Sequence, residues 1–382
     1  MDIAIITLSV MAALILLVLF LWPLALRMFA RKYYQQSYRP VPIEAAPERD
    51  YPAEYHLDTV PWITSPYPLG QSTSLQMIAA SHGIEYPRAN FDFLMAFTYG
   101  ASSLPGVGFT PLGTDPEIGL EMAAPYLGLK RVYSVAQDPQ VFLTALRSAI
   151  FKGFPVRVAL DEGILYGKRE FIAHSVVLVG YDPRGFTYYE TVGLPPAPVE
   201  PGERPAGERG LYVTDAVLLE AVEKMSQRMN YPWRYALTTF EPAPLEEDLR
   251  PIWLLIGRAM VDENKYGPRM GARVIEDLAV KIEREGPKFD LSQVRAGVEL
   301  AAQVRQDNAQ FLRSNFPLHA DLLEAAGWLE QAAHFYRLVD AELQHGIQNS
   351  IEARRVAAWL FDAAAAERKT GEIFIKRGNV PV

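Results

Sequence analysis

The sequence predicts an α+β fold with an N-terminal transmembrane helix and a C-terminal α-helical bundle. Three observations predict it: residues 3–26 form an uncharged apolar run, residues 61–240 change from helical to strand-like spacing, and helical spacing returns after residue 250. We therefore expect five segments: a transmembrane anchor at 1–32, a tether at 33–60, an α+β domain at 61–240, a helical domain at 241–370 and a tail at 371–382.

The composition excludes several classes of function. The 382 residues carry a formal net charge of −8 and show no basic stripe with interleaved aromatic residues, which argues against a nucleic-acid partner. The chain has no cysteine, so disulfides, thiolate metal sites and cysteine nucleophiles are excluded. The six histidines have neither HxxxH nor HExxH spacing, and residues 106–113 lack the GK[ST] ending of a phosphate loop. We expect neither a metal nor a cofactor.

Residues 3–26 are predicted to span a membrane. At about 1.5 Å per residue, this stretch would extend roughly 36 Å, which is enough to cross a bilayer with some tilt. A secretory signal peptide is the alternative, but Asp2 stands where such a peptide carries basic residues, and the apolar run is long for its core.

The charges that flank this run predict its orientation. Arg27, Arg31 and Lys32 follow it and no basic residue precedes it, so the positive-inside rule predicts a single-pass membrane protein whose globular part is cytoplasmic. The expected partners are the lipid bilayer, through residues 3–26, and other membrane-protein subunits. Tyr33 and Tyr34 suit an interfacial aromatic belt. Residues 33–60 are polar and contain several prolines, which predicts an extended tether rather than a helix.

Four helices are predicted at the start of the α+β domain. They lie at residues 72–82, at about 89–98, from Thr114 or Asp115 to near Gly128, and across 138–153. In the last of them, Asp138 is placed to cap the first turn and Gly153 to end the helix. Residues 130–134 have the pattern of a short strand.

Strands follow these helices. The runs FPVRVALD, HSVVLVGYD and GFTYYETVG, which begin at residues 154, 174 and 185, are rich in β-branched and aromatic residues. Residues 195–210 are rich in proline and glycine, which predicts a surface loop rather than a packed strand. Helices that precede a small sheet are typical of α+β domains.

The last third of the chain predicts a helical bundle. Residues 241–251, EPAPLEEDLRP, indicate a domain boundary. Beyond it, apolar side chains recur at helical spacing: Ile252, Leu255, Ile256 and Ala259; then Val274, Leu278 and Ile282; then Leu322 to Leu343; and finally Val356 to Ala366. The charges between them are of both signs, as expected of solvated outer faces. The tail TGEIFIKRGNVPV is short and β-like.

Helices first and strands afterwards is also the order of papain-like folds, in which a nucleophile at a helix start meets a histidine on a later strand. Residues 70–240 resemble the N-terminal papain-like domain of the butirosin biosynthesis protein H family and, more loosely, the C39-like peptidases. The resemblance is carried by GQSTSLQMIAASHG, YGASS, GFPVRVALDEGILYG and AHSVVLVGYDPRGFTYYET. The region after residue 250 resembles the helical C-terminal domain of the same family, so the resemblance covers roughly residues 65–345.

The resemblance implies a set of site residues. His174 stands where the family has its catalytic histidine, and Glu190 stands where an Asp or Asn orients that histidine. Asp161 and Tyr166 match a D…Y segment that precedes it. The position of the nucleophilic cysteine falls on Gly70, which has no side chain, so the resemblance implies a site without its nucleophile.

Simpler interpretations of these residues stay open. Ser72, Thr73 or Ser74 would offer a hydroxyl in place of the cysteine, but Ser72 or Thr73 also suits the N-cap of the helix. His174 opens an apolar strand and is equally explained as a core histidine. Glu190 is explained as a strand-end carboxylate, and Asp161 as a cap after its strand.

The sequence therefore predicts a membrane-anchored, catalytically inactive papain-like protein that acts as an accessory or scaffolding subunit of a membrane complex. Its former cleft would keep Ser72, Asp161, Tyr166 and His174 as binding residues. The alternative is an active acyltransferase or amide hydrolase that uses His174 with a non-cysteine nucleophile. A sensor that binds a small molecule in the cleft is a third possibility.

Overall fold

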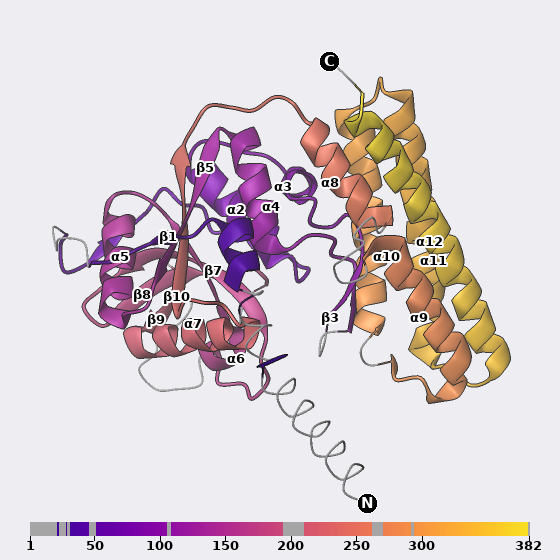
Figure 1. Ribbon diagram of the computed structural model, residues 1–382, viewed down its shortest axis with the longest axis horizontal. Coiled ribbons are helices and arrows are strands. Elements are labelled where there is room, and N and C mark those ends of the chain that lie inside the picture. The colour runs from indigo at the N-terminus through magenta and orange to yellow at the C-terminus, as the bar shows by residue number, and fades with distance from the viewer. Residues whose placement is uncertain are drawn as a thin grey trace, which may run out of the picture. The chain divides into compact units, whose positions relative to one another are not determined.

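The computed structural model describes residues 21–22, 28, 31–45, 51–104, 108–193, 210–261, 270–291 and 294–380. The chain divides into two compact units, and each unit is made of two separate stretches (Figure 1). Unit 1 comprises Met1–Thr64 and Arg131–Glu241, and unit 2 comprises Ser65–Lys130 and Pro242–Val382. The segment 65–130 thus belongs with the helical residues that follow 242.

Unit 1 is built on an eight-stranded mixed sheet in the order β1-β5-β10-β6-β7-β8-β9, with β2 paired to β7 outside this path. The strands are β1 Val41–Pro42, β2 Tyr55–His56, β5 Leu129–Ala136, β6 Val156–Asp161, β7 Ala173–Tyr181, β8 Gly185–Tyr189, β9 Leu211–Thr214 and β10 Tyr235–Pro242. β1 runs parallel to β5, whereas the pairs β10–β6, β6–β7, β7–β8 and β8–β9 are antiparallel. The three predicted β-branched runs are β6, β7 and β8, so their prediction is confirmed.

Helices α5 (Pro139–Phe151), α6 (Glu162–Leu165) and α7 (Asp215–Met229) pack against strands of this sheet (Figure 1). The boundaries of α5 are those that its end residues predict. The Asp138 carboxylate accepts hydrogen bonds from the backbone N–H groups of Gln140, at 2.8 Å, and Val141, at 2.9 Å. Gly153 lies just beyond the helix with a φ of 92°, a conformation that favours glycine.

The structure corrects the predicted extended tether. Residues 31–38 are helical, and Val41–Pro42 and Tyr55–His56 are strands of the sheet. The Tyr34 hydroxyl donates to the Met229 carbonyl at 2.8 Å, and its ring lies 4.8 Å from that of Tyr231. Tyr34 therefore packs within unit 1. The prolines of this stretch predicted an extended tether, but contacts with distant aromatic residues accompany a helix there.

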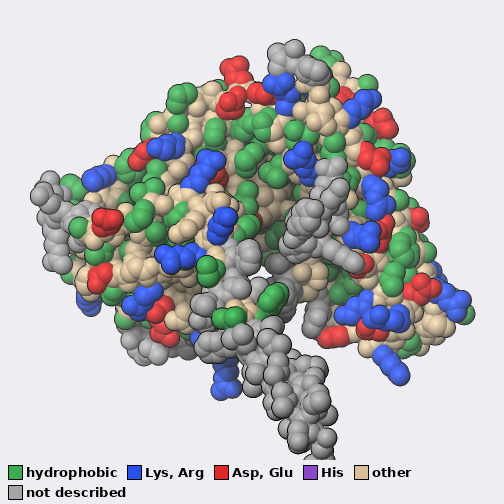
Figure 2. Space-filling model, in the orientation of Figure 1, with side chains coloured by type: hydrophobic (Ala, Val, Ile, Leu, Met, Phe, Trp, Pro, Cys, Tyr) green, Lys and Arg blue, Asp and Glu red, His purple; other side chains and the backbone are tan. Residues whose placement is uncertain are grey.

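Unit 2 is mainly helical. Its elements are α2 Gly70–Ser81, α3 Arg88–Leu94, β3 Ser102–Leu104, β4 Gly108–Thr110, α4 Pro116–Ala123, α8 Arg250–Val261, α9 Gly271–Glu285, α10 Arg295–Asn315, α11 Ala320–His345 and α12 Ser350–Gly378, with short 3-10 turns at Ala124–Leu127 and Gly286–Lys288. Basic and acidic side chains are both scattered over the face shown in Figure 2, in keeping with the mixed charges of the helical segments.

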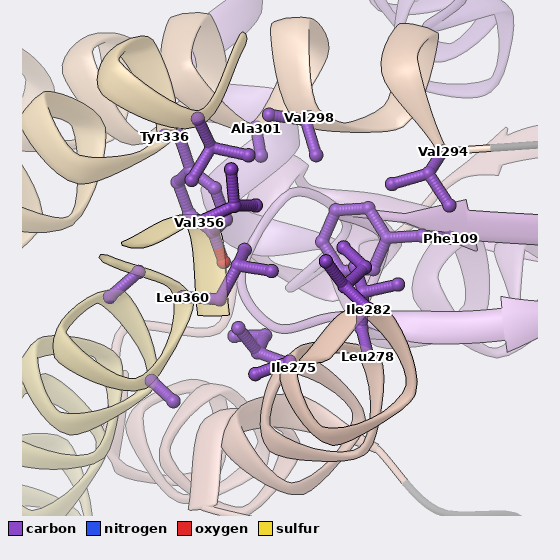
Figure 3. Packing of buried hydrophobic residues seen from close by; sticks show 14 of the residues in the cluster. Phe109, Ile275, Leu278, Ile282, Val294, Val298, Ala301, Tyr336, Val356 and Leu360 are labelled. Carbon is purple, nitrogen blue, oxygen red and sulfur yellow. The ribbon is translucent and has the colours of Figure 1, made fainter. Parts of the chain in front are cut away.

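One hydrophobic cluster forms the core of the bundle (Figure 3). It joins Ile275, Leu278 and Ile282 of α9 to Val298 and Ala301 of α10, Tyr336 of α11, and Val356 and Leu360 of α12. Phe109 of β4 points into the same cluster. The stretch 65–130 of unit 2 therefore contributes to the core formed by the helices of the later stretch, 242–382. The apolar face predicted for residues 274–282 is confirmed.

The last helix is longer than the sequence predicts. α12 continues to Gly378 and buries Phe374, so the prediction of a β-like tail is wrong. Close packing explains the extension. A Cβ on Gly371 would lie 2.6 Å from Cγ1 of Val261, and one on Gly257 would lie 2.7 Å from the Gly371 carbonyl oxygen. Glycine at both positions lets α8 and α12 approach each other, and this contact holds the end of α12 helical.

A fully buried ion pair links both stretches of unit 2. Arg305 Nε and Nη2 lie 2.8 and 3.0 Å from the two carboxylate oxygens of Glu367, and neither side chain is exposed. The same guanidinium donates to the backbone carbonyls of Thr98 and Gly100. The Tyr336 hydroxyl donates to Glu367 at 2.8 Å. This network, called the Arg305 network below, ties the loop after α3 to α10, α11 and α12.

No helix in the parts of the chain that the structure describes has the length and apolar composition needed to cross a bilayer. This finding contradicts the predicted transmembrane helix and the predicted single-pass membrane localisation, and neither is retained. Of the predicted span, residues 3–20 and 23–26 lie outside the described residues. The two longest described helices, α11 and α12, carry charged side chains along their length, whereas a span needs about 20 consecutive apolar residues. What the structure shows is an α+β fold with a mixed sheet.

Candidate functional site

The structure brings most of the predicted site residues together in unit 1 and leaves two of them in unit 2. His174 is the second residue of β7, opposite Leu160 of β6. Glu190 directly follows β8, the next strand of the sheet. Tyr166 closes α6, and Asp161 begins it. Gly70 and Ser72 belong to α2 of unit 2.

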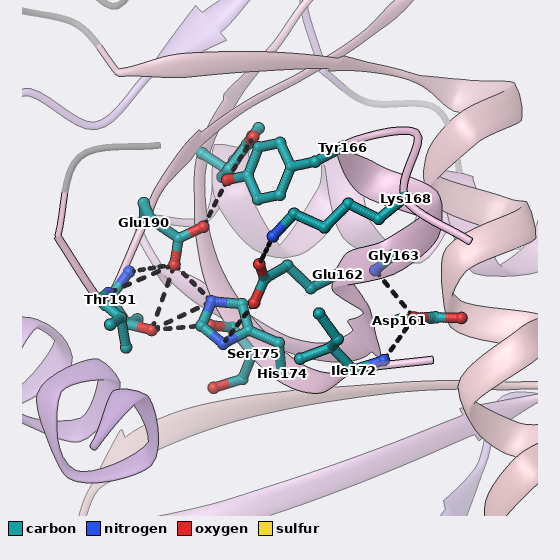
Figure 4. Close-up of polar contacts among 12 residues, drawn as sticks. Asp161, Glu162, Gly163, Tyr166, Lys168, Ile172, His174, Ser175, Glu190 and Thr191 are labelled. Atoms are coloured by element: carbon teal, nitrogen blue, oxygen red, sulfur yellow. Dashed lines mark hydrogen bonds and ion pairs between the residues drawn. The ribbon is translucent and has the colours of Figure 1, made fainter. Parts of the chain in front are cut away.

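His174 and Glu190 form a buried pair at the centre of this site (Figure 4). Nε2 of His174 is hydrogen-bonded to Oε1 of Glu190, and the two residues are 8% and 2% exposed. The Tyr166 hydroxyl donates to the other carboxylate oxygen, Oε2, at 2.5 Å. The backbone N–H of Thr191 donates to Oε1 at 2.7 Å. Because an ionised carboxylate only accepts, Nε2 carries a hydrogen, and the ring is held in a defined orientation.

These contacts set the protonation of the site. Burial alone would raise the pKa of the Glu190 carboxyl, but the hydrogen bond and charge of His174, together with the hydrogen bonds from Tyr166 and Thr191, outweigh burial and lower it. Burial and the neighbouring Glu190 carboxylate raise the pKa of Tyr166 well above its usual range. The network therefore consists of an ionised Glu190 and a neutral Tyr166 that donates to it.

The second imidazole nitrogen faces a different environment. Nδ1 of His174 lies 4.0 Å from Oε2 of Glu162, too far for a hydrogen bond. Glu162 is itself ion-paired to Lys168, with 2.6 Å between Oε1 and Nζ, and the Lys168 side chain is 40% exposed. The polar side of the site thus runs from the buried Glu190, through His174, to a Glu162–Lys168 pair at the surface (Figure 4).

Asp161 holds the local backbone and does not contact the imidazole. Its Oδ1 accepts from the backbone N–H groups of Gly163, at 2.9 Å, and Ile172, at 3.0 Å. A Cβ on Gly163 would lie 2.0 Å from the Glu170 carbonyl oxygen, so only glycine fits this turn. The interpretation of Asp161 as a cap after its strand is confirmed. Its contribution to the site is to position α6, which carries Glu162 and is followed by its C-cap Tyr166.

The start of α2 differs from the prediction. The helix begins at Gly70 with Leu69 as its N-cap and no side-chain cap, so the expectation that Ser72 or Thr73 is the N-cap is wrong. Both hydroxyls instead donate to the Leu69 carbonyl, at 3.2 and 3.1 Å, and Ser74 donates to the Gln71 carbonyl at 2.7 Å. Bonds of this kind to the preceding turn are usual for hydroxyls inside a helix. The Thr73 and Ser74 hydroxyl protons are thus committed to backbone oxygens, whereas the Ser72 hydroxyl faces both the Leu69 carbonyl and the Asp92 carboxyl.

Sequence reasoning missed three neighbours of the Glu190 pair. Glu162 and Lys168 complete the surface side, and Trp62 donates its indole N–H to the Glu190 carbonyl at 3.0 Å while stacking on Tyr189, with ring centroids 5.2 Å apart. Glu162 lies next to Asp161 in the sequence, so a helix start rich in carboxylates was a usable signal. Trp62 lies 128 residues from Glu190, and no local pattern indicates that contact.

No family model matches the chain, and no curated protein matches it. The resemblance to the butirosin biosynthesis protein H family thus depends on the quoted segments alone.

Chemically, the site holds an oriented imidazole, an ionised carboxylate and a phenol. Such a set can accept, hold or orient a proton, but among these residues none is an activated nucleophile. Among the described residues, no group of three or more His, Asp or Glu side chains is arranged to hold a metal ion.

Proposed function

We propose that this chain is a catalytically inactive protein of papain-like design whose globular part acts as an accessory or scaffolding subunit of a protein complex. The observation that carries the proposal is that the His174–Glu190 pair is assembled and buried in unit 1 without a nucleophile among its partners. The residue that the resemblance assigns to the nucleophile is Gly70, which has no side chain, and the hydroxyls that follow it in α2 donate to backbone carbonyls.

A structural role is sufficient to explain the buried pair. His174, Glu190 and Tyr166 join β7, the end of β8 and α6, and removing one member would leave buried polar atoms unpaired. A protein can therefore retain the pair for stability after catalysis is lost. A structural role for the pair favours a binding or scaffolding function of the protein over a catalytic one.

The second candidate is an amide hydrolase or acyltransferase that uses His174 with a nucleophile other than cysteine. The observation in its favour is Nδ1 of His174, which lies 4.0 Å from the Glu162 carboxylate while Nε2 is oriented by the Glu190 carboxylate. That is the arrangement of a general base whose free nitrogen faces a reactant.

Activity assays separate the two candidates. Purified full-length chain would be tested against peptide amides and acyl thioesters beside His174→Ala, with Tyr166→Phe as a milder variant of the same network. The proposal expects wild type and His174→Ala to match the uncatalysed rate. Turnover by wild type that falls on His174→Ala substitution would favour the enzyme and overturn the proposal.

The accessory role requires a partner. Isolation of the tagged full-length chain under gentle conditions should yield other subunits in constant stoichiometry, and these should bind the purified chain again on mixing. A chain that remains alone and monomeric at cellular concentrations would refute the scaffolding half of the proposal.

A further inference from the structure

Unit 2 contains a buried carboxyl group that the proposed function does not use. Asp92 of α3 is 2% exposed, and within the described parts of the chain its ion-pair partner is Arg88, whose Nε lies 3.2 Å from Oδ2. Arg88 is shared, because its Nη2 lies 2.9 Å from Oδ2 of Asp307 on α10. Its remaining nitrogen, Nη1, donates to the Ser65 hydroxyl at 3.2 Å. One guanidinium therefore serves two carboxylates.

The Asp92 carboxyl is incompletely paired among the residues that the structure describes. Its Oδ1 is buried without a hydrogen bond, and so is the nearby Tyr99 hydroxyl. A buried unpaired acceptor costs free energy, and the cost is greater when the group is charged. With both carboxyls ionised, the trio of Asp92, Arg88 and Asp307 carries one net negative charge. With Asp92 protonated the trio is neutral, and the buried charge disappears.

We propose that Asp92 is a proton-dependent switch in unit 2, protonated in mildly acidic medium and ionised at neutral pH, and that its ionised form loosens the packing of α3 against α2 and α10. The groups that face it are Ser72 from α2, Arg88 from α3, Asp307 from α10 and the Tyr99 hydroxyl. The inference is independent of the proposed function, since it holds for a scaffold and for an enzyme.

The balance of these groups favours protonation. Burial raises the pKa of Asp92 to about 6, because the opposing effects of Arg88 and Ser72 do not offset desolvation, and Asp307 adds repulsion. The folded state therefore binds a proton between about pH 4 and pH 6 that the unfolded state has already released, so stability falls as pH rises through this window. The direction is opposite to that of an ordinary salt-bridged aspartate.

The affected helix is the one that begins at Gly70. Ser72 lies in the first turn of α2 and faces both the Leu69 carbonyl and Asp92. Ionisation of Asp92 places an underpaired charge beside that turn. The switch thus acts where the two stretches of unit 2 meet, between α2 and α3 on one side and α10 on the other.

Hydrogen exchange of the full-length chain tests the proposal. Exchange in peptides from α2 and α3 would be measured near pH 5 and pH 7.5 and corrected for the intrinsic rate. A pKa difference of about 2 units corresponds to an effect of up to roughly a hundredfold on the opening equilibrium. We expect wild-type protection in α2 and α3 to fall by tenfold or more on going to the higher pH, and Asp92→Asn to remove this dependence.

Asp307→Asn is the matched variant and keeps the test decisive if Asp92→Asn does not fold. Removing Asp307 frees Arg88 for Asp92 alone and removes the like charge, so the fall in protection should become smaller and move to lower pH. Wild-type protection that is equal at both pH values would overturn the proposal. So would an Asp307→Asn profile identical to wild type, or an Asp92→Asn profile that keeps the full dependence.

Discussion

Replacing Glu367 by glutamine should destabilise unit 2 more than any comparable surface change. The substitution keeps the size of the side chain and an acceptor for the Tyr336 hydroxyl. It removes the charge opposite Arg305 and turns an amide NH2 toward the guanidinium, so two donors face each other. Arg305 would keep its carbonyl partners, Thr98 and Gly100, and its Nε bond to the oxygen that it shares with Tyr336, but it would lose the bond from Nη2 and the opposing charge.

The size of the effect follows from the burial. Both partners are 0% exposed, so no water can replace the lost carboxylate, and breaking such a pair costs about 3–5 kcal/mol. For a unit of about 200 residues, each kcal/mol lowers the melting temperature by about 2–4 °C. We therefore expect a fall of roughly 6–20 °C.

Thermal unfolding followed by far-ultraviolet circular dichroism measures this change, because most of the helix content belongs to unit 2. Glu330→Gln is the matched control. Its partner Arg313 makes the same bidentate contact, with both distances 2.8 Å, but the side chains are 39% and 45% exposed. An exposed pair contributes about 0–1 kcal/mol, so the control should melt within a few degrees of wild type. Equal small shifts in both variants would refute the argument from burial.

Three further changes have definite expected outcomes. Burial would raise the pKa of Glu190, but its hydrogen bonds lower it, so the stability that Glu190 contributes is present above about pH 4.5 and is lost as pH falls through the folded-state pKa. In Glu190→Gln, the urea midpoint of unit 1 should therefore fall less steeply at acidic pH than in wild type. An equally steep fall in both proteins would contradict the assigned pKa direction. Asp138→Ala should cost about 1 kcal/mol of unfolding free energy through the lost cap of α5, and a neutral result in urea titration would mean that the cap is redundant. Gly163→Ala should lower the free energy of unfolding by about 1–3 kcal/mol or more, because its Cβ meets the Glu170 carbonyl. Gly327→Ala, in open space within α11, should instead raise the free energy of unfolding by about 1 kcal/mol. Similar effects of the two substitutions would contradict the steric argument.

Local chemistry predicted the elements whose ends carry a specific signal. Helix α5 has an aspartate that can cap it and a glycine that can end it, and both act as expected. The β-branched runs became β6, β7 and β8 because their side chains are buried on a sheet, where such residues pack well. Residues 274–282 and 322–343 were recognisable because a helical period sustained over several turns has few alternatives.

The failures occurred where distant contacts decide the local structure. Prolines indicated an extended stretch before residue 60, yet Tyr34 pairs with Met229 and Tyr231, about 195 residues away, and the segment is partly helical. The end of α12 contains β-branched residues and was expected to be strand-like, but the buried Phe374 and the glycine contact with α8 keep it helical. Propensity at such positions is a weak guide because packing overrides it.

The candidate site was partly accessible to sequence reasoning. The resemblance implied that Glu190 orients His174, and the antiparallel pairing of β7 with β8 brings the start of one strand beside the end of the other. Sequence reasoning could not identify which imidazole nitrogen is bound, nor the surface pair of Glu162 and Lys168. These depend on the geometry of a four-residue helix that Asp161 and Gly163 shape.

The division of each unit into two stretches has a consequence for how the chain is made. The Gly100 carbonyl leaves the ribosome 205 residues before Arg305, the side chain that will bind it. At a translation rate of about 5–20 residues per second, the helices that pack on the first stretch of unit 2 are synthesised roughly 10–40 s after it. During that time Phe93, which is buried in the finished protein, lacks the rings of Trp253, Phe311 and Phe316 that pack against it. A nascent chain of this design should depend on chaperones until its last third is synthesised, and a truncation at residue 241 would leave that dependence permanent.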